Sequence, residues 1–229
     1  MSNKVLVVAA HPDDEVLGCG GTLARHVAAG DHVEVAFFTD GVGARHQPGS
    51  AAHREDEVIR NEATCRAAEI LGVASPTSFG FPDNRLDAVD LLELVKAVET
   101  LGERCRPSIV YTHWAGDLNI DHRLVYQAVM TAFRPTADCP VMQIRSFEIP
   151  SSTEWGDRVA TPAFRPNLYV EIDRFLDVKR LALDAYDREM RPFPHPRSHR
   201  AIEALARWRG AESGMHAAEA FVSVLERCP

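Results

Sequence analysis

The sequence predicts an α/β fold with a mostly parallel sheet and helices on both of its faces. Short apolar runs, typical of strands buried on both faces, alternate with longer stretches in which apolar residues recur at helical spacing. This alternation repeats through the first 133 residues at the spacing of strand–helix units, which favours a parallel sheet. The chain has 229 residues, 45% of them apolar, so it is long enough to bury a sizeable core.

Each element of this first part has its own signal. The first strand is a continuous apolar run, and Gly30 and Gly72 end the first and second helical patterns. The third helical pattern is amphipathic, with one apolar stripe. Residues 39–50 contain Gly and Pro without periodicity and should form a loop, whose length suggests a function. The expected strands are residues 4–10, 33–38, 77–81 and 108–112, and the expected helices are residues 20–29, 52–71, 87–104 and 121–133.

The pattern is less regular after Pro135. Three prolines make residues 191–196 a rigid, extended loop, and residues 220–225 fit either a strand or a helix. Strands are expected at residues 141–149 and 168–172, and helices at residues 174–191 and 202–209. No repeat or linker divides the chain, so we expect a single domain of residues 1–229: a Rossmann-like sheet with a C-terminal embellishment.

Composition argues against several classes of function. The chain has 25 Lys and Arg against 33 Asp and Glu, a net charge of −8, which argues against nucleic acid as a partner. No apolar run approaches the roughly 20 residues of a membrane span, and none fits a secretory signal. The five cysteines are odd in number and widely spaced, which argues against a disulfide framework. We therefore expect a cytoplasmic protein with no membrane partner.

A group of metal-competent side chains follows the first strand. His11 and Asp14 can converge on one cation across a turn that opens a helix, and Asp13 is placed to touch what the cation binds. One alternative is an acidic turn that caps the helix. A dinucleotide-binding turn is a second alternative, but the glycines at residues 18–21 do not fit G-x-G-x-x-G.

A second group follows the fourth strand, within residues 111–123. His122 would supply a third ligand, and two histidines with one carboxylate leave a coordination position open, as catalytic zinc sites do. Asp117 and Asp121 could hold the ring nitrogens of the ligands. Taken alone, the Asp121–His122 pair would read as a helix cap with a solvated histidine; its position opposite the first group favours the metal site.

These motifs together resemble a known family. His-Pro-Asp-Asp-Glu at residues 11–15, followed by Gly-Gly-Thr, joins a later Asp-x-Asn-x-Asp-His at residues 117–122. The combination resembles the LmbE-like (PIG-L) family of zinc-dependent N-deacetylases. Residues 60–73, 82–87 and 207–221 resemble further family segments, so the likeness extends over most of the chain.

The resemblance implies roles for individual residues. His11, Asp14 and His122 would hold one Zn²⁺, Asp13 would be the general base, and Asp83 with Arg60 would contact substrate hydroxyls. Some family members have a histidine that assists catalysis where this chain has Asn119, which can donate a hydrogen bond but cannot transfer a proton at neutral pH. The proton for the leaving amine would then come from Asp13 or from another histidine, with His195 and His113 as candidates.

The implied reaction is release of acetate from an N-acetylated amino sugar or sugar conjugate by a homo-oligomeric enzyme. Arg85 would suit the sugar hydroxyls or be a solvated loop cation, and His113 could line the pocket. An amidase for a larger acyl glycoside or thiol conjugate is an alternative, as is a carbohydrate- or nucleotide-binding module without catalysis. The presence of Asp13 disfavours the module, because binding alone requires no general base.

Overall fold

The computed structural model describes residues 2–47, 49–157 and 159–228, which form a seven-stranded sheet of order β3-β2-β1-β4-β5-β7-β6. The strands are β1 (Lys4–Ala9), β2 (His32–Thr39), β3 (Thr77–Phe81), β4 (Ile109–Thr112), β5 (Gln143–Phe147), β6 (Leu168–Glu171) and β7 (Ala218–Glu226). The first five strands in this order, β3, β2, β1, β4 and β5, are parallel to one another. Strand β7 is antiparallel to both of its neighbours, β5 and β6. The predicted mostly parallel α/β sheet is confirmed, and residues 220–225 belong to a strand.

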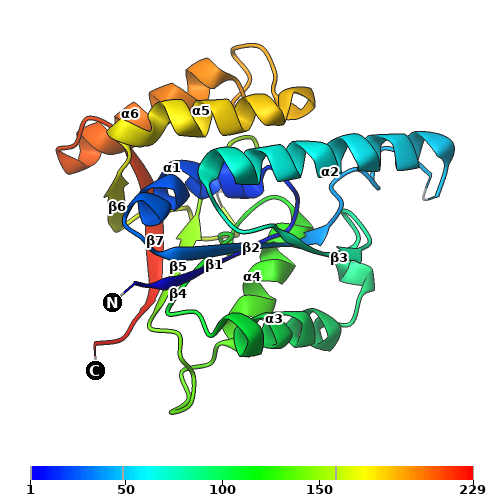
Figure 1. The fold of residues 1–229 in the computed structure, drawn as a ribbon, viewed down its shortest axis with the longest axis horizontal. Helices are drawn as coiled ribbons and strands as arrows, with labels where there is room; N and C mark the ends of the chain where they lie inside the picture. Colours follow the sequence, from blue (N-terminus) through cyan, green and yellow to red (C-terminus); the bar gives the residue numbers. More distant parts are fainter. Residues whose placement is uncertain (1, 48, 158, 229) are drawn as a thin grey trace.

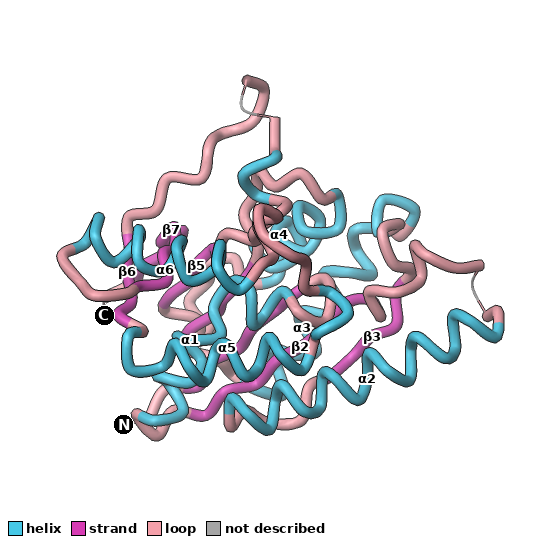
Figure 2. The backbone as a smooth tube through the Cα atoms, turned by 90° about the horizontal axis from the view of Figure 1, so that it is seen from above, coloured by secondary structure: helices cyan, strands magenta, loops and turns pink. Residues whose placement is uncertain are grey.

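Helices cover both faces of the sheet (Figure 1). On one face lie α1 (Asp14–Ala28), α2 (Ala51–Leu71), α5 (Leu176–Ala185) and α6 (His199–Ser213); on the other lie α3 (Leu91–Cys105) and α4 (Ile120–Ala132). Figure 2 shows α5 beside α1 and α2, against which it packs. Successive residues of β1 alternate between the two cores, with Val5 and Val7 on the α1 side and Leu6 and Val8 on the α3 side.

The first helix begins earlier than predicted, at Asp14 and not at residue 20. Gly18, in the segment expected to be a turn, lies inside α1, which is kinked at Cys19 (φ −148°, ψ 16°). A Cβ added to Gly18 would lie 2.5 Å from Cδ2 of Phe147, so only glycine allows α1 to approach the sheet this closely. Glycine interrupts the helical pattern, which is why the sequence predicts a turn in this first part of α1.

Three later helices also differ from their predicted bounds. Residues 86–88 form a 3₁₀ turn because the Asp121 carboxylate binds the backbone N–H of Leu86, so α3 starts at Leu91. The helix expected at 174–191 ends at Ala185, and a further 3₁₀ turn at 187–189 buries Glu189. α6 is longer than predicted, since Ser198 caps its start. No helix in the described ranges combines the length and hydropathy that crossing a membrane requires.

The expected loop at residues 39–50 is confirmed from residue 40 onward where the structure describes it; Thr39 is the last residue of β2, and Pro48 lies outside the described residues. Ser50 closes this segment by capping α2, since its Oγ accepts a hydrogen bond from the N–H of His53 at 3.1 Å. Gly41, within the loop, has φ +70°, and a Cβ there would lie 3.0 Å from Nη1 of Arg60. The same Cβ would lie 3.2 Å from Cδ of Pro12 and 3.4 Å from Cβ of His11, so the loop lies against the residues that follow β1.

Candidate metal centre

The candidate site lies where the strand order reverses direction, at the carboxyl ends of the neighbouring strands β1 and β4. His11 follows β1 directly after Ala10, and Asp14 is the first residue of α1. The first turn of α4 contributes His122. Asn119 fixes this turn by capping the helix: its Oδ1 accepts a hydrogen bond from the N–H of Asp121 at 2.8 Å.

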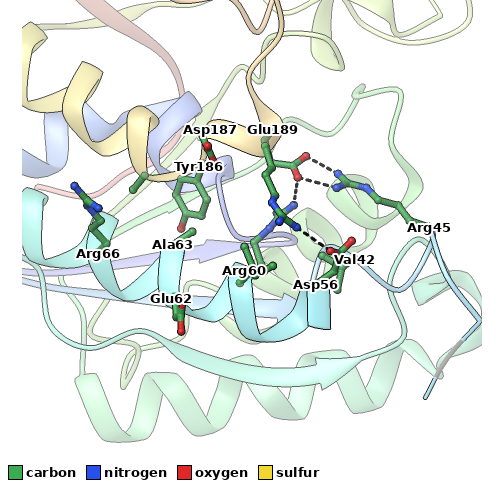
Figure 3. Close-up of a pocket in the computed structure, with 13 residues that line it drawn as sticks. Val42, Arg45, Asp56, Arg60, Glu62, Ala63, Arg66, Tyr186, Asp187 and Glu189 are labelled. Atoms are coloured by element: carbon green, nitrogen blue, oxygen red, sulfur yellow. Dashed lines mark hydrogen bonds and ion pairs between the residues drawn. The ribbon is translucent and has the colours of Figure 1, made fainter. Parts of the chain in front are cut away.

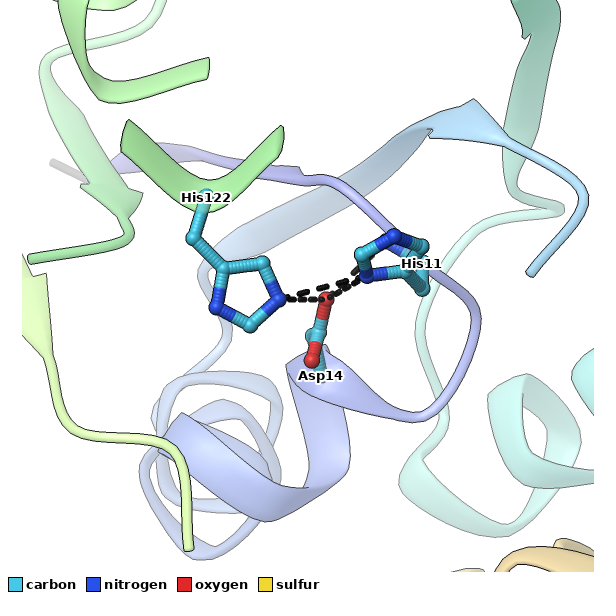
Figure 4. A group of neighbouring side chains, drawn as sticks. All are labelled: His11, Asp14 and His122. Atoms are coloured by element: carbon cyan, nitrogen blue, oxygen red, sulfur yellow. Dashed lines mark hydrogen bonds and ion pairs between the residues drawn. The ribbon is translucent and has the colours of Figure 1, made fainter. Parts of the chain in front are cut away.

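The three predicted ligands converge on one point (Figure 4). His11 Nδ1 lies 3.2 Å from Asp14 Oδ2 and 3.2 Å from His122 Nε2, and His122 Nε2 lies 3.3 Å from Asp14 Oδ2. A tetrahedral cation with ligands at about 2.05 Å would separate them by about 3.3 Å, so this donor set fits a zinc-sized ion. Oδ1 of Asp14 is buried and has no hydrogen-bond partner among the described residues, which also suits a site built for a cation.

Three carboxylates hold the ligand imidazoles from behind. Asp117 Oδ1 lies 3.1 Å from Nδ1 of His122, while Asp83 Oδ1 and Asp121 Oδ2 each lie 3.3 Å from Nε2 of His11. Asp117 and Asp121 thus occupy the places expected for residues that orient metal-binding histidines. His11, Asp83 and Asp121 form a second possible metal-binding group, but Asp121 already accepts two backbone hydrogen bonds and Asp83 accepts one.

The buried acidic and imidazole groups of the candidate site shift one another's pKa values. Burial lowers the pKa of His122, but the charges of Asp14 and Asp117 outweigh burial and raise that pKa to about 9. Burial raises the pKa of Asp14, yet the neighbouring histidines bring it well below its ordinary value. Burial likewise opposes the effect of His122 on Asp117, whose pKa falls to about 2. Without a metal ion, the neighbouring carboxylates therefore favour the protonated, positively charged form of the His122 imidazole.

Asp13 lies directly before the helix and is almost completely buried, with 3% of its surface exposed. It has a left-handed backbone (φ 118°), which is strained for a residue other than glycine and is held by a 3.0 Å bond from its N–H to Oε2 of Glu15. Its Oδ2 accepts a 2.7 Å hydrogen bond from Nη1 of Arg197. Burial raises the pKa of Asp13. The positive charge of Arg197 opposes this increase, whereas the negative charge of Asp14 adds to it.

Comparison with known proteins agrees with this geometry. A family model described as PIG-L, GlcNAc-PI de-N-acetylase, matches residues 6–133. The chain is 31% identical over 186 residues to the uncharacterized deacetylase YaiS of Escherichia coli (strain K12), covering 78% of this chain and 88% of that protein. The chain belongs to the PIG-L family.

Other relatives differ in their sequence identity to this PIG-L chain and in the share of each chain that the match covers. It is 35% identical over 107 residues to the diacetylchitobiose deacetylase of Thermococcus kodakarensis, covering 47% of this chain and 39% of that protein. The conserved protein TT1542 from Thermus thermophilus has 28% identity and a TM-score of 0.77, with 99% of this chain and 97% of that chain covered. GalB, the 4-carboxy-2-hydroxymuconate hydratase of Pseudomonas putida KT2440, has a TM-score of 0.76 at 21% identity, covering 100% of this chain and 98% of its own. The fold alone thus does not decide the reaction.

Two residues expected at the substrate take other places in this PIG-L chain. His113 is fully buried, stacked on His122 with ring centroids 3.9 Å apart, and its Nε2 accepts the N–H of Ala10 at 2.8 Å. His113 therefore packs behind His122 and is not exposed to a substrate pocket, which corrects the expectation that it lines one. Arg60 is 6% exposed; it donates to the carbonyl of Pro12 at 2.6 Å and pairs with Glu189. Its guanidinium is occupied within the protein, which corrects the expectation of a substrate-hydroxyl contact.

Figure 3 shows the cleft beside Arg60, where Arg45 and Arg60 approach the Glu189 carboxylate from two sides. Nη1 of Arg45 donates to Oε1 of Glu189 at 2.8 Å. Because Arg60 also holds the Pro12 carbonyl, this cluster supports the turn that presents Asp13. The sequence offered no spacing signal for the cluster, since its members come from three separate segments of the chain.

The remaining predicted residues surround the centre more loosely. Besides capping α4, Asn119 donates through Nδ2 to Oδ1 of Asn84 at 3.1 Å. His195 is half-buried, with its ring edge-on to Trp155 at 5.8 Å, and its Nδ1 accepts the N–H of Arg197. Arg85 is exposed, and its side chain has no hydrogen bond or ion pair with any described residue; its carbonyl accepts the N–H of Ala88 at 3.0 Å. Asp83 is 5% exposed and lies against His11, beneath the surface and not on it.

Sequence reasoning missed Arg197, the residue that binds Asp13. It lies two positions after His195 in the proline-rich segment, and only the histidine of that segment attracted attention. The available signal was a cation in a stiffened segment of a chain whose predicted site is strongly acidic. That signal does not identify a partner 184 residues away.

Proposed function

We propose that this protein is a metal-dependent N-deacetylase that hydrolyses the acetamide of an N-acetylated amino sugar or its conjugate. The observation that supports this most directly is the convergence of His11, Asp14 and His122 within 3.3 Å of one another, beside a buried and strained Asp13. Zn²⁺ is the proposed metal, because two imidazoles and one carboxylate suit it. The named relatives that are deacetylases support the same reaction.

The chemistry divides between the metal and the chain. Bound Zn²⁺ supplies Lewis acidity, which lowers the pKa of a ligated water to about 7 and polarises an amide carbonyl. Oδ2 of Asp13 is taken up by Arg197, and no described residue donates to Oδ1, so Oδ1 is available to accept a proton. Asp13 removes a proton from the attacking water and returns it to the amide nitrogen, so that the C–N bond breaks into acetate and a free amine.

The structure narrows the choice of proton donor for the leaving amine. His113 is a poor candidate, because its Nε2 accepts a backbone N–H and burial, its largest influence, brings its pKa well below the ordinary value. Asn119 has no transferable proton at neutral pH. Asp13 therefore carries the proton in both directions, and His195 is the competing candidate, testable by substitution.

The substrate class rests on the relatives. The matching family model is described for GlcNAc-PI, and the relative from Thermococcus kodakarensis is named for diacetylchitobiose, both of which contain N-acetylglucosamine. Exposed Arg85, on the segment that follows Asp83, suits a sugar hydroxyl or a neighbouring anionic group. We expect a homo-oligomer in the cytoplasm; light scattering and cell fractionation would check both points.

The decisive experiment combines metal content with product analysis. Protein loaded with Zn²⁺ should release one acetate per amine from N-acetylglucosamine conjugates, lose activity with a chelator and regain it with Zn²⁺. His11→Ala, Asp14→Ala and His122→Ala should each empty the site. Asp13→Asn should keep the metal and lose about 10²–10⁴-fold in rate.

Each other outcome points to a different function. Release of a longer acyl group in preference to acetate would identify an amidase of broader type. Sugar binding without any turnover in the metal-loaded protein would identify a binding module. Full metal occupancy in all three alanine variants would disprove the ligand assignment.

A further inference from the structure

Arg197 is a charged residue from the last third of the chain that reaches the proposed general base. Its Nη1 donates to Oδ2 of Asp13 at 2.7 Å, across 184 residues of sequence. The side chain of Arg197 is 20% exposed and that of Asp13 is 4% exposed, so the pair is largely shielded from solvent. Shielded charge-assisted bonds are both stronger and more directional than surface ion pairs.

Arg197 is itself held on both sides. Its Nε donates to Oγ of Ser151 at 2.9 Å, and its backbone N–H donates to Nδ1 of His195 at 3.1 Å. The next residue, Ser198, caps α6 and is buried, so the segment enters a helix directly after Arg197. The guanidinium is therefore presented by a fixed backbone and by a second loop.

The neighbouring arginine cannot take this part. Arg60 approaches from α2, but it donates to the carbonyl of Pro12 and pairs with Glu189, and no hydrogen bond joins it to the Asp13 carboxylate. Nη1 of Arg197 lies 4.0 Å from Oε2 of Glu189, so Arg197 lies between Glu189 and the base. Among the described side chains, Arg197 alone forms a hydrogen bond to the carboxylate of Asp13.

We propose that Arg197 is a positioning residue for the base: by holding Oδ2 of Asp13 it fixes the carboxylate so that Oδ1 faces the attacking water. This inference rests on the proposed function. It also assigns part of the active site to residues beyond 133, where the family match ends. Arg197 acts through Asp13 and is not required to touch the substrate.

The test compares Arg197→Met, Arg197→Lys and Arg197→Ala with a matched control, Arg209→Met. Arg209 is on α6 and is similarly shielded, with a side chain 14% exposed, but its partners are Glu148 and Glu212. Arg197→Met should lower kcat by about 10²-fold, as expected for a displaced catalytic group, with KM changed less than about threefold and zinc content unchanged. Arg197→Lys should recover part of the loss, and millimolar methylguanidine should raise the kcat of Arg197→Ala while urea does not. Arg209→Met should keep wild-type kcat.

A crystal structure of Arg197→Met provides a measurement that does not depend on activity. The Asp13 carboxylate should turn away from its wild-type position or become disordered. An unchanged Asp13 carboxylate, or a kcat per bound zinc within about twofold of wild type, overturns the inference. Absence of acetate release by the wild-type protein from every N-acetyl sugar would instead refute the proposed function, and the crystallographic comparison would still decide the role of Arg197.

Discussion

Replacing Glu219 with glutamine tests whether one buried ion pair stabilises the kinked helix that leads into the site. In an unbroken helix the N–H of Gly21 would bind the carbonyl of Leu17. In α1 these two groups bind side chains instead: Gly21 donates to Oε1 of Glu219 at 3.0 Å, and Leu17 accepts from Nζ of Lys179 at 2.9 Å. Lys179 and Glu219 also bind each other at 2.6 Å, and each side chain is 5% exposed.

The expected loss of stability follows from what remains after the change. The glutamine side chain would be neutral, so the Lys179 ammonium would be buried without a counter-charge, which typically costs about 3–5 kcal/mol. Oε2 of Glu219 also accepts the N–H of Thr22 at 2.7 Å, and an amide has only one acceptor for the two backbone donors. We therefore expect Glu219→Gln to lower the free energy of unfolding by about 3–5 kcal/mol.

Urea unfolding followed by circular dichroism measures this loss. Lys179→Met should also be destabilising, but the double variant should lose less than the sum of the two single variants, by about 0.5–3 kcal/mol. Arg180→Gln is the control. Arg180 lies on α5 next to Lys179, but its side chain is 53% exposed, and its exposed ion pairs should contribute less than about 1 kcal/mol to stability. A loss below about 1 kcal/mol in Glu219→Gln, or strict additivity in the double variant, would refute this account of the kink.

Further outcomes are expected at the metal centre and in α1. Zinc affinity should rise with pH up to about 9, because the raised pKa of His122 means that a bound proton must leave first; competition with a chelator at several pH values measures it, and a flat profile contradicts it. Protonated His122 should also stabilise the fold of the metal-free protein. This contribution to the free energy of unfolding should be complete below about pH 6.5 and should disappear as the pH rises through 9, which thermal melts would detect. Asp117→Asn should weaken zinc binding about 10–100-fold by freeing the His122 ring, measured by zinc titration. Gly18→Ala should destabilise the fold by about 1–3 kcal/mol, because its Cβ would clash with Phe147; an unchanged Tm would contradict this.

The sequence predicted that His11, Asp14 and His122 come together because each lies next to a strong local signal. His11 and Asp14 follow an unmistakable buried strand, and His122 follows the next strand of the same sheet edge. Parallel strands place their carboxyl ends together, so the two segments had to meet at one edge. The orientation of Asp117 and Asp121 toward the imidazoles follows from the same proximity.

The predictions that failed share a different cause. The sequence predicts a turn where α1 starts, because Gly18 interrupts the helical pattern and its contact with Phe147 is visible only in the fold. His113 was placed at the pocket because it follows a strand, although burial beneath His122 depends on packing that no periodicity encodes. Arg60 was assigned to substrate, but its partner Glu189 is 129 residues away.

Two parts of the chain therefore contribute to the site in different ways. The proposed ligands and the carboxylates beside them lie within residues 6–133, next to the strand ends that fix their positions. The groups near Asp13, among them Arg197 and Glu189, come from residues beyond 133 and depend on how α5 packs on α1 and α2 and how α6 packs on β6 and β7. Since Asp13 is strained and buried, its geometry is sensitive to that packing. A change in the last third can thus alter the rate of proton transfer while the metal stays bound, and this separation is what the comparison of kcat with zinc content in the Arg197 variants measures.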